Sequence, residues 1–167
     1  MGRFSRTPYF KLKNDGTIKV ALPDEVRQLL SKLADELGEA IETDHEDLRR
    51  LFPTAYPDDA SKDAGYQVFS RNELIEGRQA RIATLRETAH ANTVTEEQLS
   101  AWMQVVNDLR LLLGTKLDIS EETNLATFNP ADYTNPNDAL QDMALYEALG
   151  ELLSHIIDAL MGALEKE

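Results

Sequence analysis

The fold is decided by residues 95–114, which read TEEQLSAWMQVVNDLRLLLG. Thr95 and Gln98 have the spacing of a capping box, in which two side chains bond the backbone at a helix start. Apolar residues then recur three or four positions apart, as along one face of an α-helix; they are Leu99, Trp102, Val106, Leu109 and Leu113. Gly114 is typical of a residue that ends a helix. We therefore expect a central helix over 96–113, closed by Gly114.

Four residues of this helix are candidate structural or interaction residues: Trp102, Asn107, Asp108 and Arg110. Arg110 lies about 60° from the centre of the apolar stripe on a wheel of ~3.6 residues per turn. An arginine at the edge of a buried face normally pairs with a carboxylate, so we expect a structural ion pair there. Asn107 and Asp108 lie towards the opposite side of the helix.

The N-terminal segment predicts a β-hairpin over residues 9–22. Two short alternating apolar runs flank Asn14-Asp15-Gly16, which supplies the positive φ of a tight turn. A lone hairpin is marginally stable, so it should pack on the helix predicted after Pro23. A further short helix is expected over 46–52, ended by Pro53.

Residues 58–88 predict helix, and Ser70 with Glu73 has capping-box spacing, which indicates two helices that meet near Ser70. The second of them should bury Leu74, Ile75, Ile82 and Leu85. Its polar face should carry Arg71, Arg78, Arg81 and Arg86. Residues 89–94 are expected to form a loop.

The C-terminal third predicts a long polar loop over 115–136 and a helix over 137–164. Apolar residues cover more than one stripe of that helix, so either other helices surround it or part of it contacts a second copy. We expect a homodimer through 137–164. The chain should form one mainly α domain over 1–167. It comprises a basic arm and β-hairpin (1–22) and a five- to six-helix orthogonal or bundle domain around helix 96–113.

Composition limits the function classes. Thirty acidic residues against 17 basic ones give a net charge of −13. The absence of cysteine excludes disulfides, thiolate metal sites and thiol redox chemistry within these residues. No apolar run approaches the ~20 residues that span a bilayer, and the first residues lack the apolar core of a secretory signal. We expect a cytoplasmic protein that is not inserted into a membrane.

No motif indicates catalysis, a cofactor or a metal. The histidines, His45, His90 and His155, do not have metal-ligand spacing. The cluster Asp44-His45-Glu46-Asp47 is consecutive, so its side chains cannot face one point on a helix. We expect a non-enzymatic protein; the alternative is an enzyme with an acidic site.

Basic residues offer a second hypothesis, direct contact with DNA or a partner. The candidates are Arg3, Arg6, Lys11 and Lys13 in the arm and hairpin, and Arg71, Arg78 and Arg81 on the Arg71–Arg86 face. The ordinary interpretation of the second group is neutralisation by neighbouring acids such as Glu73, Glu76 and Glu87. Because the protein is so acidic, most of its surface would repel double-stranded DNA, which is a polyanion.

Three segments together resemble an actinobacterial family, long known as a domain of unknown function, that includes the AosR oxidative-stress transcriptional regulators. The first holds Trp102, Asn107-Asp108-Leu109-Arg110, Gly114 and Lys116-Leu117. The others are Asp47–Pro53 running on to Ala55–Pro57, and Leu145-Tyr146 with Leu149-Gly150. The resemblance implies a small helical cytoplasmic protein and, for some members, promoter regulation with a sigma factor as partner.

Redox-sensing members of that family use a pair of cysteines. This sequence has none, so thiol–disulfide switching has no residue to act through here. The leading expectation is a regulatory or adaptor protein that acts through protein–protein contacts. A DNA-binding regulator is the alternative.

Overall fold

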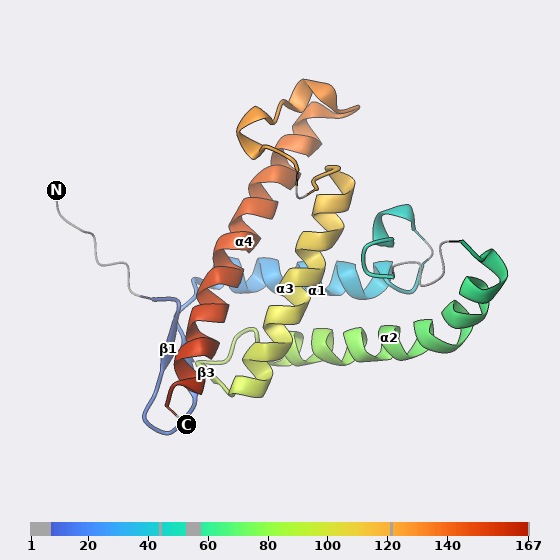
Figure 1. Cartoon of the computed structure of the whole chain (residues 1–167). Coiled ribbons are helices and arrows are strands. Elements are labelled where there is room, and N and C mark those ends of the chain that lie inside the picture. The colour runs from blue at the N-terminus through green and yellow to red at the C-terminus, as the bar shows by residue number, and fades with distance from the viewer. Residues whose placement is uncertain (1–7, 44, 53–57, 121, 167) are drawn as a thin grey trace.

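The computed structural model describes residues 8–43, 45–52, 58–120 and 122–166. The fold is mainly α, as predicted (Figure 1). Four long helices are described: α1 (Asp24–Ala40), α2 (Ala60–Thr88), α3 (Glu96–Lys116) and α4 (Pro136–Leu164). Three short strands accompany them, β1 (Phe10–Leu12), β2 (Ile18–Val20) and β3 (Thr93–Val94). The remaining elements are single 3-10 turns, η1 (Glu46–Leu48), η2 (Leu125–Thr127) and η3 (Pro130–Asp132).

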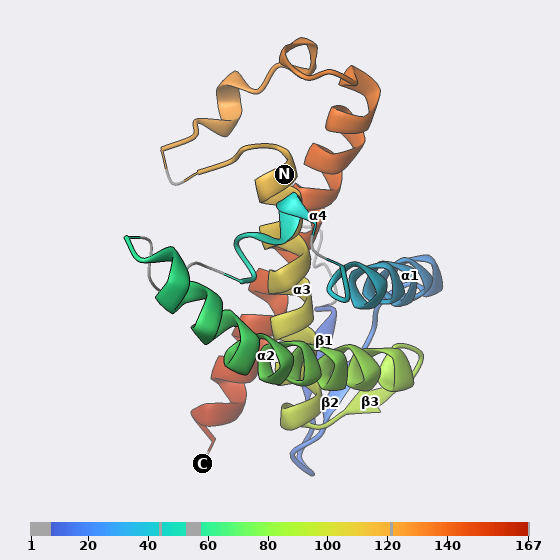
Figure 2. The same cartoon turned by 90° about the vertical axis from the view of Figure 1, so that its right-hand side faces the viewer.

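Helix α3 is the centre of the molecule, as its apolar stripe predicts. It packs mainly against α2 and α4, and Figures 1 and 2 show it between these two helices. The Trp102 side chain is fully buried, and its indole Nε1 donates a hydrogen bond to the Thr88 hydroxyl at 2.7 Å. The capping box is confirmed, because Thr95 and Gln98 each accept a hydrogen bond from the other's backbone N–H.

The end predicted for this helix is wrong by about one turn. Gly114 lies inside α3, and the left-handed residue that ends the helix is Asp118, with φ 54°. The Ile119 N–H bonds the Gly114 carbonyl at 2.7 Å and the Asp118 N–H bonds the Thr115 carbonyl, which is a Schellman motif. Gly114 serves close packing instead, because a Cβ there would lie 3.0 Å from a guanidinium nitrogen of Arg50.

The predicted hairpin is present, and residues 93–94, predicted as loop, add a third strand. The antiparallel sheet has the order β1-β2-β3, with Phe10 opposite Val20 and Ile18 opposite Val94. Gly16 takes the turn position, with φ 85°. A two-residue strand is too short to show a period in the sequence, which is why β3 was not predicted.

Arg27 connects this sheet to the helices. Its side chain is 6% exposed and donates four hydrogen bonds to backbone carbonyls, at distances of 2.7–3.1 Å. The acceptors belong to Val20, Leu22, Ala89 and Ala91. Because these carbonyls come from two separate segments, one side chain holds β2 and the end of α2 against α1.

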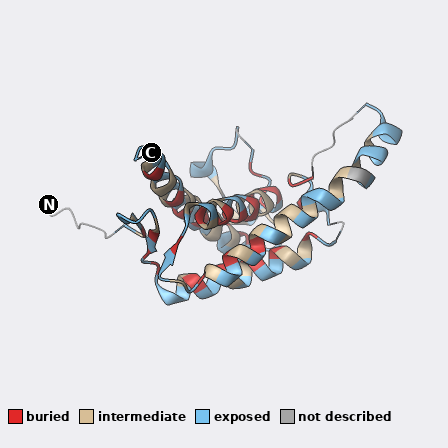
Figure 3. Cartoon of the chain, turned by 90° about the horizontal axis from the view of Figure 1, so that it is seen from below, coloured by how far each residue is buried: buried red, intermediate tan, exposed pale blue. Residues whose placement is uncertain are grey.

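Residues 60–88 form one helix, so the prediction of two helices meeting near Ser70 is wrong. Capping-box spacing also occurs by chance within a continuous helix, and a true cap needs an extended backbone at its first residue. Leu74, predicted as buried, is 38% exposed because the N-terminal half of α2 projects from the globule. Figure 3 shows that projecting half mostly in the colour of exposed residues.

Two other segments differ from their predictions. The short helix expected over 46–52 is reduced to the single turn η1, followed by further turns. The loop expected over 115–136 begins only after α3 ends and holds η2 and η3. A small second apolar cluster includes Leu117 and Met143, and the Tyr133 hydroxyl donates to the Leu117 carbonyl at 2.7 Å.

Candidate functional site

A groove runs along the side of α3 that faces neither the core nor the sheet. Its floor is a strip of α3 at helical spacing, Glu97, Ser100, Gln104 and Asn107. Helix α2 forms one wall and α4 the other. Three hollows of about 530, 580 and 300 Å³ make up this surface, and they share lining residues such as Met103 and Arg81. We call it the α3 groove.

The inner end of the groove contains a largely buried ion pair. The Arg78 Nε donates to the Asp108 carboxylate at 3.2 Å, and the two side chains are 13% and 11% exposed. The Arg78 guanidinium also lies 5.0 Å from the centre of the Phe52 ring. Asp108 therefore lies in the interior and not on the exposed side of α3, which corrects its predicted position. Arg78 reaches it from α2.

Burial raises the pKa of the Asp108 carboxyl above its ordinary value, because water no longer solvates the charge. The nearby positive charges of Arg78 and Arg81 oppose that rise. Desolvation therefore disfavours the charged form of Asp108, and the two guanidinium groups offset only part of that cost.

Two donors at this end of the groove lack an acceptor within the described residues. They are the buried Nη1 of Arg78 and Nε of Arg81. Buried polar groups are nearly always hydrogen-bonded, so each exception asks for an explanation. Two guanidinium groups share one carboxylate here, so this end of the groove carries excess positive charge, and the two unpaired nitrogens lie beneath its surface.

The outer end of the groove is apolar with acidic residues beside it. Met161 and Leu164 of α4 are 56% and 61% exposed, and Ile157 is 40% exposed. Met103 of α3 lines the same hollow with Glu96 and Glu97, and no basic residue of the described chain lines it. Methionine side chains are flexible and suit surfaces that adapt to a partner.

Arg110 does not make the carboxylate pair predicted for it within the described residues. Its guanidinium lies over the Tyr146 ring, 4.4 Å from the ring centre. It also lies against Gly150, where an added Cβ would approach the guanidinium to 3.1 Å. A planar guanidinium stacks well on an aromatic face, and the glycine leaves room for it. Arg110 therefore helps to join α3 and α4.

The basic residues predicted to contact nucleic acid do not form one surface. Arg3 and Arg6 lie outside the described residues. Lys11 and Lys13 are on the hairpin, near the C-terminal end of α2 (Figure 1). Arg71 lies in the other half of α2, where it contacts the Phe52 ring at 4.3 Å and the Thr43 carbonyl.

Sequence reasoning found Asp108 and Arg78 separately but did not pair them, since they are 30 residues apart. It also missed a cleft of about 490 Å³ on the opposite side of α3, between α1, η1 and α4. Within the described ranges, no group of three or more His, Asp or Glu residues could hold a metal ion. No described helix combines the length and the apolar character needed to cross a bilayer.

Comparison with known proteins gives one family and a set of curated relatives. The model of DUF2017, described as a domain of unknown function, matches residues 5–160. Proteins named oxidative stress regulator AosR, from Mycobacterium tuberculosis and Mycobacterium bovis, are 28% identical to this chain. The alignment covers 91% of the chain and 78% of each relative. No solved structure matches.

Proposed function

This chain belongs to the DUF2017 family, and we propose that it is a non-enzymatic regulatory protein of the stress response that acts by binding other proteins. The regulatory role is supported by the printed name of the relatives, oxidative stress regulator. The mode of action is supported by one observation, the α3 groove with its two chemically different ends.

The groove suits an amphipathic helix of a partner protein. Such a helix presents apolar side chains at positions i, i+3 or i+4, and i+7 to a hydrophobic groove. Ile157, Met161 and Leu164 are spaced in the same way along α4 and would contact them. Basic side chains at one end of the partner helix would face Glu96 and Glu97. A carboxylate at the other end would lie near the excess positive charge of Arg78 and Arg81.

A second copy of the chain suits the outer end of this groove less well. Glu96 and Glu97 line it, and Asp158 is exposed on the adjacent wall. Two copies meeting there would bring like charges together, which costs affinity. The homodimer through 137–164 stays a prediction; light scattering at ~100 μM, a concentration at which stable dimers persist, decides between one copy and two.

The partner is proposed to be a subunit of the transcription machinery such as a sigma factor, as the family resemblance implies. The sensing step must differ from a thiol switch in these residues, because the sequence has no cysteine. Partner binding through the groove needs no such switch.

The test is a calorimetric titration of the whole chain with purified sigma factors from its own cell. Met161→Glu places a charge in the groove, whereas Leu140→Glu places one on an equally exposed part of α4 outside it. We expect at least one sigma factor to bind the native chain and Leu140→Glu alike and to bind Met161→Glu at least tenfold more weakly. Equal binding to both variants, or none to the native chain, would reject the proposal.

Direct DNA binding remains the competing hypothesis, and a gel-shift series in salt tests it. Phosphate contacts make affinity fall steeply as salt rises. A shift at low salt that Lys11→Ala and Lys13→Ala abolish together would favour the hairpin as a DNA contact. No shift at low salt would eliminate it.

A further inference from the structure

The cleft on the opposite side of α3 has the character of a small-molecule site. Its α3 residues are Leu109, Leu112, Leu113 and Lys116, which lie about 150° from the groove strip at ~100° per residue. Its volume of about 490 Å³ lies within the ordinary range of ligand pockets. The cleft is therefore a separate feature from the α3 groove, and nothing inferred from one rests on the other.

Leucine side chains form most of its surface. They come from four segments that are far apart in the sequence: α1, η1, α3 and α4. The leucines are Leu33, Leu37, Leu48, Leu109, Leu112, Leu113, Leu145 and Leu149, with Ala40 beside them. Aliphatic walls without a Phe, Tyr or Trp side chain suit a flexible aliphatic body better than a flat ring, which gains most from stacking.

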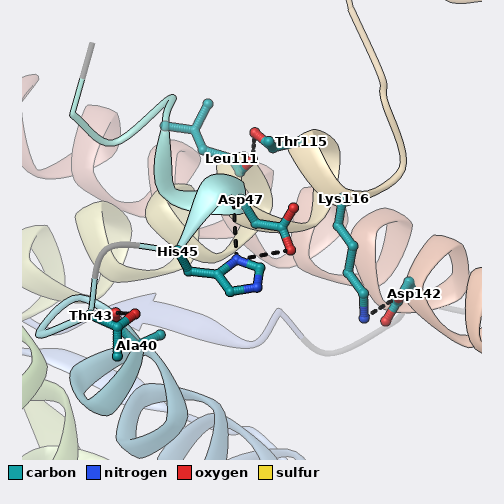
Figure 4. A network of polar contacts seen from close by, with 8 residues as sticks. All are labelled: Ala40, Thr43, His45, Asp47, Leu111, Thr115, Lys116 and Asp142. Carbon is teal, nitrogen blue, oxygen red and sulfur yellow. Dashed lines mark hydrogen bonds and ion pairs between the residues drawn. The ribbon is translucent and has the colours of Figure 1, made fainter. Parts of the chain in front are cut away.

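Four polar residues of the cleft lie on two sides of it, as Figure 4 shows: His45 and Asp47 on one, Lys116 and Asp142 on the other. Glu36 of α1 also lines the cleft. The Nδ1 of His45 lies 3.1 Å from the backbone nitrogen of Asp47 and 3.4 Å from the Asp47 carboxylate. The Lys116 Nζ lies 2.8 Å from the Asp142 carboxylate.

The charges of the cleft favour a cation. With histidine counted as neutral, three carboxylates, those of Glu36, Asp47 and Asp142, line it against the single ammonium of Lys116, which leaves two negative charges. Glu36 also lies 3.9 Å from the Lys32 ammonium on the same helix. The hydrogen bond to Asp142, with the charges of Asp142, Asp138 and Asp47, holds the pKa of Lys116 above its usual range. The negative charge of the cleft would repel an anionic ligand. The one ammonium group there, that of Lys116, is already paired with Asp142.

We propose that this cleft binds a small amphipathic organic cation. Its aliphatic body lies on the leucines, and its charged group lies beside Glu36 and Asp47, the two carboxylates of the cleft that Lys116 does not pair. The ligand class is thus an aliphatic amine, and the whole-molecule charge of −13 favours its approach.

The test compares three probes with the same six-carbon chain: hexylammonium, hexanol and hexanoate. Each is titrated into the isotopically labelled chain and followed by the amide signals of Leu112, Leu113 and Leu145. We expect hexylammonium to bind with a Kd on the order of millimolar, as suits so small a ligand, and at least tenfold more tightly than hexanoate. Hexanoate binding as tightly, or signals moving only outside the cleft, would overturn the proposal.

Two variants on α1 isolate the charge. Glu36→Gln removes a carboxylate that lines the cleft, and Glu39→Gln removes an exposed one on the same helix that does not. We expect Glu36→Gln to weaken hexylammonium severalfold and to leave hexanol unchanged, while Glu39→Gln changes neither. Equal effects of the two variants would mean that the overall charge, and not the cleft, attracts the cation.

A third variant isolates the apolar body. Ala40→Leu adds side-chain volume to the wall of the cleft at the last residue of α1. We expect it to abolish binding of hexylammonium and hexanol while the amide spectrum keeps its native dispersion. Undiminished binding in a folded Ala40→Leu chain would contradict the assignment of the cleft.

Discussion

Arg27 and Arg78 are both largely buried, yet their surroundings differ in kind. Arg27 donates to four backbone carbonyls and, within the described residues, leaves no buried donor unpaired. Arg78 has one bond, to the Asp108 carboxylate, and its Nη1 has no acceptor in the described chain. A fully satisfied polar network fixes the structure around it, whereas a partly satisfied one costs stability. We infer that Arg27 serves the fold, whereas Arg78 leaves a buried donor unpaired beside the α3 groove, the surface proposed to bind a partner.

The largest effect should follow from Arg27→Met. The change leaves several buried carbonyls without a donor, at about 1–3 kcal/mol for each, so the free energy of unfolding should fall by about 4 kcal/mol. Urea denaturation followed by circular dichroism measures it. The matched control is Arg86→Met, which removes an exposed ion pair with Asp35 and should cost less than ~1 kcal/mol. A loss of unfolding free energy below ~2 kcal/mol for Arg27→Met would contradict the structural role assigned to Arg27.

The next effect, about 2 kcal/mol at pH 7, should follow from Arg78→Met, because the Asp108 carboxylate then stays buried without its pair. This loss should depend on pH. The folded-state pKa of Asp108 is already raised above 3.8 by burial, and removing Arg78 raises it further. At a pH above 3.8, Asp108 then binds a proton more readily in the folded chain than in the unfolded chain. The free energy of unfolding therefore falls as pH rises through the raised pKa of Asp108.

Stability of Arg78→Met should therefore recover as pH is lowered from neutral towards 3.8. Unfolding free energies of the variant and the native chain, compared across that range, show whether the difference narrows. The double variant with Asp108→Asn has no carboxyl to protonate and should lack this recovery. A pH-independent loss in Arg78→Met would contradict the account of Asp108.

A smaller effect is expected from Asp108→Asn on its own, less than about 1 kcal/mol. Burial already disfavours the charged carboxyl, so a neutral residue of the same shape loses little. Arg78 keeps its contact with the Phe52 ring. The asymmetry between the two partners of one ion pair is measured by the same urea titration. Equal losses for Arg78→Met and Asp108→Asn would show an ordinary, mutually stabilising pair.

The smallest effect on stability should come from Arg81→Gln, within about 0.5 kcal/mol. This residue lines the groove, and its buried Nε has no acceptor in the described residues. Its role in the proposed function predicts that binding of the protein partner weakens while the unfolding curve stays native. Calorimetry with the partner and urea denaturation together separate the two effects.

Local patterns predicted the parts of the fold that depend on neighbouring residues. The capping box at Thr95, the turn at Gly16 and the start of the last helix, predicted at residue 137 and found at Pro136, are all visible within a few residues. The end of α3 was misplaced because a glycine that serves close packing looks the same in sequence as one that ends a helix. Asp118 takes the left-handed position that glycine usually occupies.

Contacts between distant segments could not be predicted. Arg78 and Asp108 were each named, but their pairing depends on how α2 crosses α3. Arg110 was placed at the edge of a buried face, yet its partner is the Tyr146 ring, because Gly150 on α4 leaves room for the guanidinium. The leucine cleft needs four segments to come together, and no single segment shows it.

The most direct test of the central claim is photo-crosslinking in the cells of origin. A photoreactive amino acid is placed at Met161 in the groove and, in a second strain, at Leu140 on the same helix outside it. The account predicts an adduct with a transcription subunit such as a sigma factor at position 161 and none at 140. Adducts that join two copies of the chain at 161, or the same adducts at both positions, would contradict it.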